Sequence, residues 1–440
     1  MKIRFLRYTI LLALCAATTS IIYAAGQGTF RVVAYMSRYD QPAGLTEGSP
    51  GTFYGVAGSS QTVTFSVTRQ GTKTILSSFP SGYNLESIPV SGANGRLYSS
   101  YEQGSYPAHV FSTTSTTGSA VSYPGQSVVP ELLLSSPDSN LLGVGIWLAS
   151  NLWGVIKSDL KGNVASIYQF PSTVHLPPTL VYATDGSYYG VSLASTSTAG
   201  YVYRVTASGT STNIYTFPVN AFKGNYLVPL IQASDGNLYG ATPTGGANGT
   251  GTIYKLTLAG QFTQLYQFPP GKDWNPTSLI EASDGNLYGA TLGINGYSRL
   301  FRITKSGQYT VLYAMNNAAA DGACQCDLVQ GSDGIIYGTA QGGGVTGAGA
   351  IFAFDAGLPP PLPQPLHVEP SSGPVGTKVL IWGRNLLSPS VSFNGVPAAA
   401  VVSSGANYVW ATVPAGASTG PVTVTTPAGS GTTRGSYTVE

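Results

Sequence analysis

Four aspartates recur with a fixed period, and their residue type first suggests chemistry. Asp185, Asp235, Asp284 and Asp333 each stand directly before a glycine, so successive copies lie 50, 49 and 49 residues apart. Carboxylates and turn carbonyls are ligands that Ca²⁺ accepts. One carboxylate per copy is too few for a strong site, whereas Asp-Gly between apolar residues is typical of a tight hairpin turn. The pattern therefore favours structural turns over a calcium site.

An aromatic position repeats beside these turns. A ring of tyrosines would suit sugar binding, but a side chain repeated on the inner side of a unit more often packs one unit against the next. We therefore expect packing tyrosines. They stand at Tyr54, Tyr98, Tyr189, Tyr239, Tyr288 and Tyr337.

Residues for catalysis or metal binding do not form a recognisable motif. His109, His175 and His367 are the only histidines, and none has the spacing of a paired metal ligand. We therefore predict no catalytic residues, no metal and no cofactor. Carboxylates could still pair across a ring for glycosidic chemistry, although their separation does not follow from the sequence. The candidates for such a pair are Glu102, Asp273, Glu281 and Asp321.

The period itself predicts the architecture. One copy has four short β-patterns, at 277–282, 287–291, 299–304 and 309–314, with the Asp-Gly turn between the first two. Four antiparallel strands in about 49 residues match one blade of a β-propeller. The same turn can be followed to positions 50, 94, 138, 185, 235, 284 and 333, which predicts seven blades.

The two ends of the repeat region complement each other. The last copy has its third strand at 349–354 and then runs into prolines without a fourth. The segment 29–36 is an extra strand with the pattern of a fourth strand, as at 262–268. We expect it to complete the seventh blade, because pairing the first and last strands closes the ring and removes exposed edges. The alternative is an open stack of sheets.

Loops that differ between blades are the expected place for binding. Those after the second and fourth strands of all blades converge at one mouth of the ring. Exposed aromatics with a few polar groups suit carbohydrate or peptide recognition, although ordinary loop residues have a similar composition. The candidate ligand-binding residues are Tyr101, Glu102, Tyr106, Trp147, Asp273, Trp274, Asn295 and Tyr297.

The C-terminal part differs in character. A proline-rich linker at 358–365 separates it from the repeats, and the 49-residue period then stops. Short alternating strands are expected at 378–382, 391–393, 408–413, 421–426 and 436–439, with a tight hairpin at 393–396. About 75 residues of this kind predict a small immunoglobulin-like sandwich.

The N-terminus predicts export. Lys2, Arg4 and Arg7 precede a short apolar run and then small residues, so we expect a signal peptide cleaved after Ala24. An uncleaved anchor and a lipoprotein using Cys15 are the alternatives. No other stretch is apolar and long enough to span a membrane. Export places the chain in the periplasm, at the cell surface or outside the cell.

The charge balance excludes nucleic acid as a partner. The chain has 20 basic and 18 acidic residues; without the three basic residues of the signal the balance is 17 against 18. Such a chain has no basic footprint for nucleic acid. Cys324 and Cys326 remain outside the signal, and export favours a disulfide between them, with two inert thiols as the alternative.

Two family resemblances follow from these motifs. The repeat Ser-Asp-Gly-Asn-Leu-Tyr-Gly, followed by Gly-Thr-Ile-Tyr-Lys-Leu at 251–256 and Gln-Leu-Tyr-Gln-Phe at 264–268, resembles the bacterial GloVer tandem repeat. The motifs at 370–377, 381–386 and 391–398 resemble the IPT/TIG domain. These resemblances imply an exported surface protein whose tail is an immunoglobulin-like module.

The expected function is recognition. We predict an all-β, seven-bladed propeller that serves as a non-enzymatic scaffold for carbohydrate or envelope proteins. The alternative is a propeller lyase or hydrolase acting on extracellular glycans, and a purely structural spacer is a third reading. The expected organisation is a signal peptide at 1–24, a propeller at 26–357, a linker at 358–365 and an IPT/TIG domain at 366–440.

Overall fold

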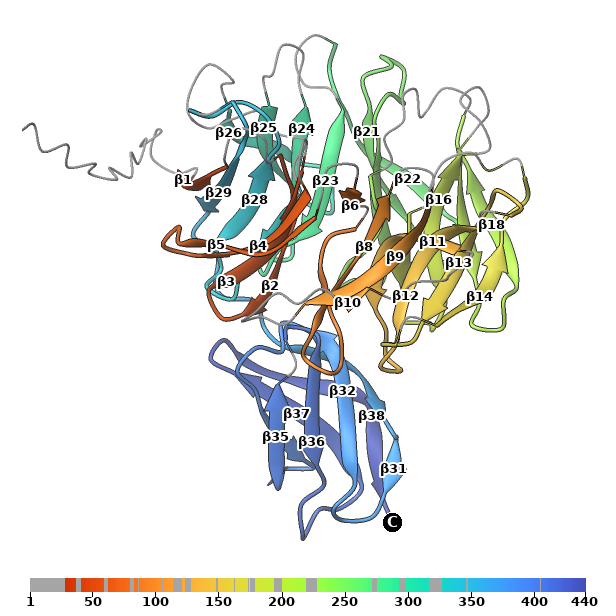
Figure 1. Ribbon diagram of the computed structural model, residues 1–440, viewed down its shortest axis with the longest axis vertical. Helices are drawn as coiled ribbons and strands as arrows, with labels where there is room; N and C mark the ends of the chain where they lie inside the picture. The colour runs from red at the N-terminus through yellow and green to blue at the C-terminus, as the bar shows by residue number, and fades with distance from the viewer. Residues whose placement is uncertain are drawn as a thin grey trace, which may run out of the picture.

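The regular structure consists of β-sheets arranged in two bodies (Figure 1). The computed structural model describes residues 28–440 except 37–40, 59–61, 80–82, 86, 104–105, 114–120, 123–127, 148, 162, 173, 175–178, 194–199, 219–227, 271–274, 293–297, 316–326, 346 and 404. Seven of the nine sheets form a ring of blades, and the last two form a sandwich beneath it. In the described part of the chain no helix is long and apolar enough to cross a membrane.

The first three blades follow the chain in order, from the strand nearest the ring axis outward. Their strands are β2 (Pro42–Ser49), β3 (Thr52–Ala57), β4 (Thr62–Thr68) and β5 (Lys73–Phe79); β6 (Tyr83–Leu85) and β7 (Val90–Ser91), which both pair with β8 (Leu97–Gln103), then β9 (Tyr106–Thr113) and β10 (Val121–Ser122); and β11 (Val128–Ser135), β12 (Leu141–Trp147), β13 (Leu152–Ser158) and β14 (Val164–Gln169).

The next three blades repeat this four-stranded meander. Their strands are β15 (Val181–Tyr182), β16 (Tyr188–Leu193), β17 (Gly200–Val205) and β18 (Ser211–Thr216); β19 (Ile231–Gln232), β20 (Leu238–Thr242), β21 (Thr252–Leu256) and β22 (Phe262–Gln267); and β23 (Pro276–Glu281), β24 (Leu287–Leu292), β25 (Ser298–Ile303) and β26 (Tyr309–Ala314). The last of these agrees with the strands expected from the sequence to within about one residue.

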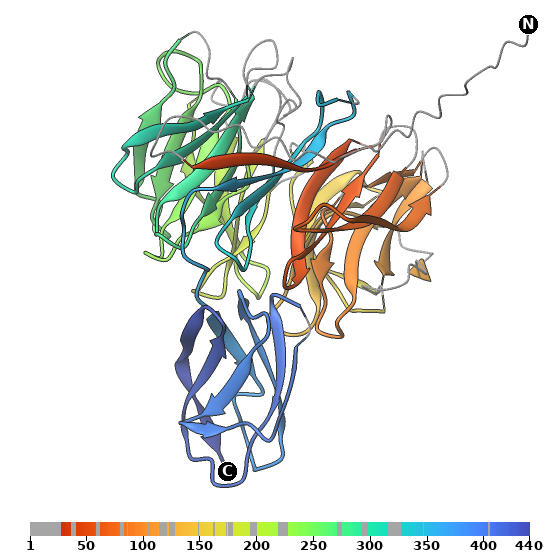
Figure 2. The same ribbon diagram turned by 90° about the vertical axis from the view of Figure 1, so that its left-hand side faces the viewer.

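The seventh blade joins the two ends of the ring. It contains β27 (Leu328–Gln330), β28 (Ile336–Ala340) and β29 (Ala350–Asp355), and its outer strand is the N-terminal β1 (Thr29–Tyr35), antiparallel to β29. Figure 2 shows β1 running along this blade. The predicted closure is confirmed, and so are seven blades.

A pairing of glycine with an aromatic residue recurs in several blades. Gly289 in β24 lies opposite Phe301 in β25, and a Cβ atom at Gly289 would lie 2.3 Å from the Phe301 ring. Gly338 and Phe352 form the same pair in the seventh blade. The glycine in Leu-Tyr-Gly therefore makes room for an aromatic ring from the next strand, which is buried between blades.

The C-terminal sandwich has two sheets around its own apolar core. The first sheet contains β30 (Gln364–Glu369), β32 (Lys378–Arg384), β36 (Tyr408–Thr412) and β35 (Ala400–Ser403), and the second contains β31 (Ser372–Gly373), β38 (Gly429–Val439), β37 (Gly420–Thr426), β33 (Ser390–Phe393) and β34 (Val396–Pro397). The hairpin at Asn394-Gly395 has both residues at positive φ, 45° and 86°, as the sequence predicts.

One strand of the sandwich begins inside the expected linker. β30 starts at Gln364, although the proline pattern predicts an extended linker to residue 365. Pro365 is tolerated because β30 is the edge strand of its sheet, where a missing N–H breaks no central ladder.

Candidate functional site

The repeated Asp-Gly turns are built from internal hydrogen bonds. Asp235 Oδ1 accepts a bond from the Asn237 N–H at 3.2 Å, and its Oδ2 accepts one from the Tyr239 hydroxyl at 2.7 Å. The same carboxylate–tyrosine bond measures 2.8 Å at Asp185, 3.0 Å at Asp284 and 2.8 Å at Asp333. The glycine after each aspartate has positive φ. These contacts account for the repeat motif by turn geometry.

The repeated tyrosines are packing residues. Tyr239 and Tyr337 are fully buried, and Tyr288 is almost so. Burial raises the pKa of their hydroxyls, and the neighbouring turn aspartates raise this pKa further. The preference for packing over a sugar-binding ring is therefore supported.

A second set of contacts joins each turn to the next blade. The residue three positions before the turn aspartate reaches back to the backbone N–H of the Ser or Thr in the preceding blade's turn. Gln232 binds Thr184 N at 2.8 Å, Glu281 binds Ser234 N at 2.7 Å, and Gln330 binds Ser283 N at 2.9 Å. We call this contact the blade clasp. The serine hydroxyl takes part in the same contact: Ser234 Oγ donates to Glu281 Oε1 at 2.6 Å, and Ser283 Oγ accepts from Gln330 Nε2 at 2.8 Å. These hydroxyl bonds explain why a serine precedes Asp-Gly in the motif.

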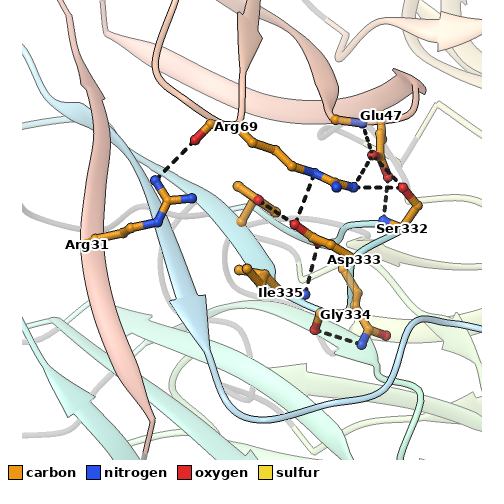
Figure 3. A network of polar contacts seen from close by, with 10 residues as sticks. Arg31, Glu47, Arg69, Ser332, Asp333, Gly334 and Ile335 are labelled. Atoms are coloured by element: carbon orange, nitrogen blue, oxygen red, sulfur yellow. Dashed lines mark hydrogen bonds and ion pairs between the residues drawn. The ribbon is translucent and has the colours of Figure 1, made fainter. Parts of the chain in front are cut away.

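The clasp also closes the ring, where it is reinforced by an arginine. Glu47 Oε2 accepts a bond from the Ser332 N–H at 2.7 Å. Arg69 lies between the two blades, 3.1 Å from Glu47 Oε1 and 3.0 Å from Asp333 Oδ2 (Figure 3). Arg31 of β1 adds a bond to the Arg69 carbonyl at 3.2 Å. The first and last blades are thus joined by the ion pairs of Arg69 as well as by the pairing of β1 with β29.

Three blades carry a different residue at the clasp position, and the sandwich docks there. The position holds Ser91, Ser135 and Tyr182 in the second, third and fourth blades. Trp382 of β32 donates a 3.4 Å bond to Ser135 Oγ and meets the Tyr182 ring edge-on, with centroids 5.5 Å apart. A Cβ atom on Gly405 of the sandwich would lie 2.6 Å from Ser91 Oγ.

Buried hydrogen bonds fasten this junction. The Tyr408 hydroxyl accepts from Ser136 N at 2.8 Å and donates to Ser136 O at 2.7 Å. Trp410 Nε1 donates to Ala93 O at 2.8 Å. Leu380, Trp382 and Tyr408 of the sandwich share an apolar cluster with Ala93 of the propeller. The sandwich is therefore seated on the turn end of the propeller, as Figures 1 and 2 show from two sides.

A hollow remains beside this junction. Three adjoining cavities of about 360, 400 and 470 Å³ lie between turns and sandwich, and Arg384 lines all three. We call them together the interdomain hollow. Its walls carry amides from both bodies, the Tyr182 ring and the edge of Trp382. Its polar lining includes Gln232, Gln330, Gln364, Asn385 and Asn407.

The charges around the hollow are unevenly compensated. Glu47 is paired with Arg69 at 3.1 Å, Glu281 with Lys305 at 2.5 Å, and Asp185 with Arg204 at 3.2 Å. Within the described part of the chain, Arg384 has only a 3.4 Å bond to the Gln232 carbonyl. Burial lowers the pKa of Arg384, and the Glu281 charge opposes that shift only in part.

Most residues of the expected loop face lie outside the described part of the chain. This holds for Asp273, Trp274, Asn295, Tyr297, Cys324 and Cys326, and for the side chains of Tyr101, Glu102 and Tyr106. Trp147 is described, and it ends β12 with its ring over Gly154, where a Cβ atom would lie 2.5 Å away. Glu281, a candidate for glycosidic chemistry, serves in a clasp. Among the described residues no group of three or more metal-binding side chains occurs.

The residues of the hollow were not expected from the sequence. The sequence did offer one signal for three of them: each stands three positions before a turn aspartate. These residues are Gln232, Glu281 and Gln330. Nothing in the sequence links Arg384 to Gln232, 152 positions earlier, because their contact exists only once both bodies have folded.

Comparison with known families agrees with this construction. The Gloeobacter/Verrucomicrobia repeat matches residues 176–358, and the IPT/TIG domain matches residues 363–439. Both resemblances seen in the motifs are confirmed. No curated protein sequence is similar enough to count as a relative.

Solved structures share the fold at low identity. A fungal alcohol oxidase in complex with copper has 12% identity and a TM-score of 0.52, covering 92% of this chain and 98% of its own. An oligogalacturonate lyase from Vibrio parahaemolyticus has 12% identity and a TM-score of 0.52, covering 76% and 96%. The BP39L lectin from Burkholderia pseudomallei has 11% identity and a TM-score of 0.50, covering 69% and 96%. Likeness at this level shows the propeller fold alone.

Proposed function

We propose that this chain, a propeller with Gloeobacter/Verrucomicrobia repeats and a C-terminal IPT/TIG domain, is an exported protein that recognises a carbohydrate in the interdomain hollow. The observation that carries this proposal is the hollow itself. Residues of two folded bodies line it, and Arg384 of the sandwich lines all three cavities together with turn residues of several blades. The propeller acts as the scaffold, and the IPT/TIG domain supplies one wall of the site.

The chemistry of the walls favours a sugar over an apolar ligand. Sugars present many hydroxyls, and amide side chains and guanidinium groups both bind hydroxyl oxygens. An apolar edge beside such polar groups is the usual composition of a small-molecule site, and a volume of about 360 Å³ for one of the cavities lies in the usual range. Tyr182 and Leu366 supply that edge.

Export and domain boundaries belong to the same proposal. We place the signal peptide at 1–24 and the propeller at 26–357. Because β30 of the sandwich starts at Gln364, the linker expected at 358–365 becomes 358–363 and the IPT/TIG domain 364–440. The loop face that contains Trp147 and Trp274 is a second proposed contact surface, for surface proteins or glycans. Fractionation of a bacterial host and the intact mass of the exported chain test this; a chain retained in the cytoplasm with its first 24 residues would contradict it.

A glycan array with the chain from residue 25 onward tests the site. Gln364→Trp should abolish binding, because Gln364 is exposed in β30 and lines two of the three cavities without taking part in a clasp. Gln261→Trp places the same bulk on an exposed turn away from the hollow and should bind normally. Binding that survives Gln364→Trp would move recognition elsewhere, and an array without any signal would refute a carbohydrate ligand.

A further inference from the structure

Arg384 is a cation without a matching anion among the described residues. It ends β32, the strand whose Trp382 contacts the propeller turns at Ser135 and Tyr182, and it is partly buried. Among the described residues no carboxylate lies within 4.0 Å of its guanidinium, and its single hydrogen bond is the 3.4 Å contact with the Gln232 carbonyl. A guanidinium carries five N–H donors and remains protonated in proteins. Most of its donors therefore have no partner among the residues that the structure describes.

The acids around Arg384 are already engaged. Glu281, the acid whose charge acts on Arg384, is held by Lys305 at 2.5 Å and by the Ser234 N–H at 2.7 Å. Glu47 is held by Arg69 and by Ser332. The uncompensated charge that lines the hollow is therefore positive. Arg434, exposed at the rim, adds to it, and it too has no acid within ion-pair distance among the described residues.

The position of Arg384 gives its donors access to a ligand. It lines all three cavities of the hollow, so a molecule lying along them would pass its side chain. A carboxylate accepts two parallel N–H bonds from a guanidinium, and this geometry is stronger and more directional than a neutral hydrogen bond. Hydroxyls beside the carboxylate would meet the surrounding amides.

We infer that the ligand of the interdomain hollow is an acidic oligosaccharide, and that Arg384 binds the carboxylate of a uronic-acid residue in it. This inference rests on the proposed carbohydrate-binding function. It assigns Arg384 the selection of charge and leaves the neutral parts of the sugar to amides such as Asn385 and Asn407. The rim cation Arg434 contributes long-range attraction only.

If Arg384 had a purely structural role, the predicted effect of its loss would be different. In that case the guanidinium would help to seat the sandwich, and its loss would lower stability without altering which sugars bind. The two roles separate when the ligand is changed and the protein is not, because a methyl ester removes the carboxylate charge and keeps the sugar ring.

The experiment is calorimetric titration of the chain from residue 25 onward. The probes are trimers and tetramers of galacturonate, glucuronate and mannuronate, their methyl esters, and the corresponding neutral oligomers. At least one acid form should bind at least about tenfold more tightly than its ester. Arg384→Gln should weaken that binding by about 10- to 100-fold, and Arg384→Lys by less. Lys161→Gln, at an exposed turn of the third blade, is the matched control and should change nothing.

Each contrary result has a distinct meaning. Equal binding of acids and esters, or unchanged binding by an Arg384→Gln variant that melts as the wild type does, overturns the acidic-ligand inference. Binding of neutral oligomers alone overturns it too and leaves the proposed function standing. If no acidic or neutral sugar binds, the inference and the proposed function both fail. The ester comparison stays decisive even where Arg384→Gln loosens the domain junction.

Discussion

The Glu47 carboxylate accepts a 2.7 Å hydrogen bond from the Ser332 N–H, although the two residues are 285 positions apart. This contact is the same clasp that joins neighbouring blades elsewhere, as between Glu281 and Ser234. At the closing point the clasp also carries the Arg69 ion pairs. Ring closure therefore combines the clasp that recurs between blades with ion pairs that are specific to the closing point.

Glu47→Ala should weaken ring closure. Glu47 is 5% exposed, and its loss removes one of the two acids that pair with Arg69 and the acceptor of the Ser332 N–H bond. Breaking one side of such a buried network costs about 3 kcal/mol. Glu47→Gln should cost less, because the amide occurs naturally at the equivalent positions Gln232 and Gln330. Urea unfolding of both variants measures this; equal losses would mean that the clasp geometry contributes nothing beyond charge.

Gly289→Ala should destabilise the sixth blade by about 1–3 kcal/mol, because the added Cβ atom would overlap the Phe301 ring. Phe301→Leu alone should also destabilise, by leaving space in the core. The double variant should lose less than the sum, since the smaller side chain relieves the overlap with the ring, although the Ser278 carbonyl oxygen at 2.6 Å still crowds the new methyl group. A thermal double-mutant cycle measures the coupling. Strict additivity would contradict the proposed packing of glycine against the aromatic ring.

The repeat made much of the fold predictable. A period of about 49 residues with Asp-Gly turns specifies blade number and strand order, because each copy must bury the same face against its neighbour. The complementary end strands, 29–36 and 349–354, made the closure predictable as well. The start of β30 was not, since proline composition gives no sign that an edge strand will accept Pro365.

The candidate site was much less accessible from the sequence. Repetition draws attention to Asp235 and Tyr239, whose contacts lie within one hairpin. The hollow depends instead on Arg384, which stands outside the repeat and meets Gln232 only through domain docking. Such contacts depend on how the two domains are placed relative to each other, and the repeat pattern within either domain does not predict that placement.

Tyr408→Phe should loosen the junction between propeller and IPT/TIG domain. The hydroxyl bonds both the N–H and the carbonyl of Ser136 in a buried setting, so its loss should cost about 1–3 kcal/mol. Faster proteolysis within 358–363 and a separate melting transition for the sandwich are expected. Tyr254→Phe is the control, because its buried hydroxyl has no hydrogen-bond partner among the described residues. Identical behaviour of the two variants would contradict a docking role for Tyr408.

The carboxyl of Asp327 should make the free energy of unfolding depend on pH. It directly precedes β27, and its Oδ2 lies 3.0 Å from the point where a Cβ atom of Gly44 would stand, with the Ile88 side chain at 2.3–2.4 Å from the same point. Burial raises the pKa of Asp327 from 3.8 to about 6. No described residue donates a hydrogen bond to this carboxylate.

The sign of the effect follows from that raised pKa. The folded chain prefers the protonated acid, so the contribution to stability is complete below pH 3.8 and is lost as pH rises through about 6. Asp327→Asn should therefore raise the free energy of unfolding at pH 7.5, by at most about 3 kcal/mol and by less with solvent screening. The gain should shrink towards pH 4. Urea titrations of both proteins between pH 4 and 8 measure the difference, and curves that stay parallel over this range would contradict the assignment.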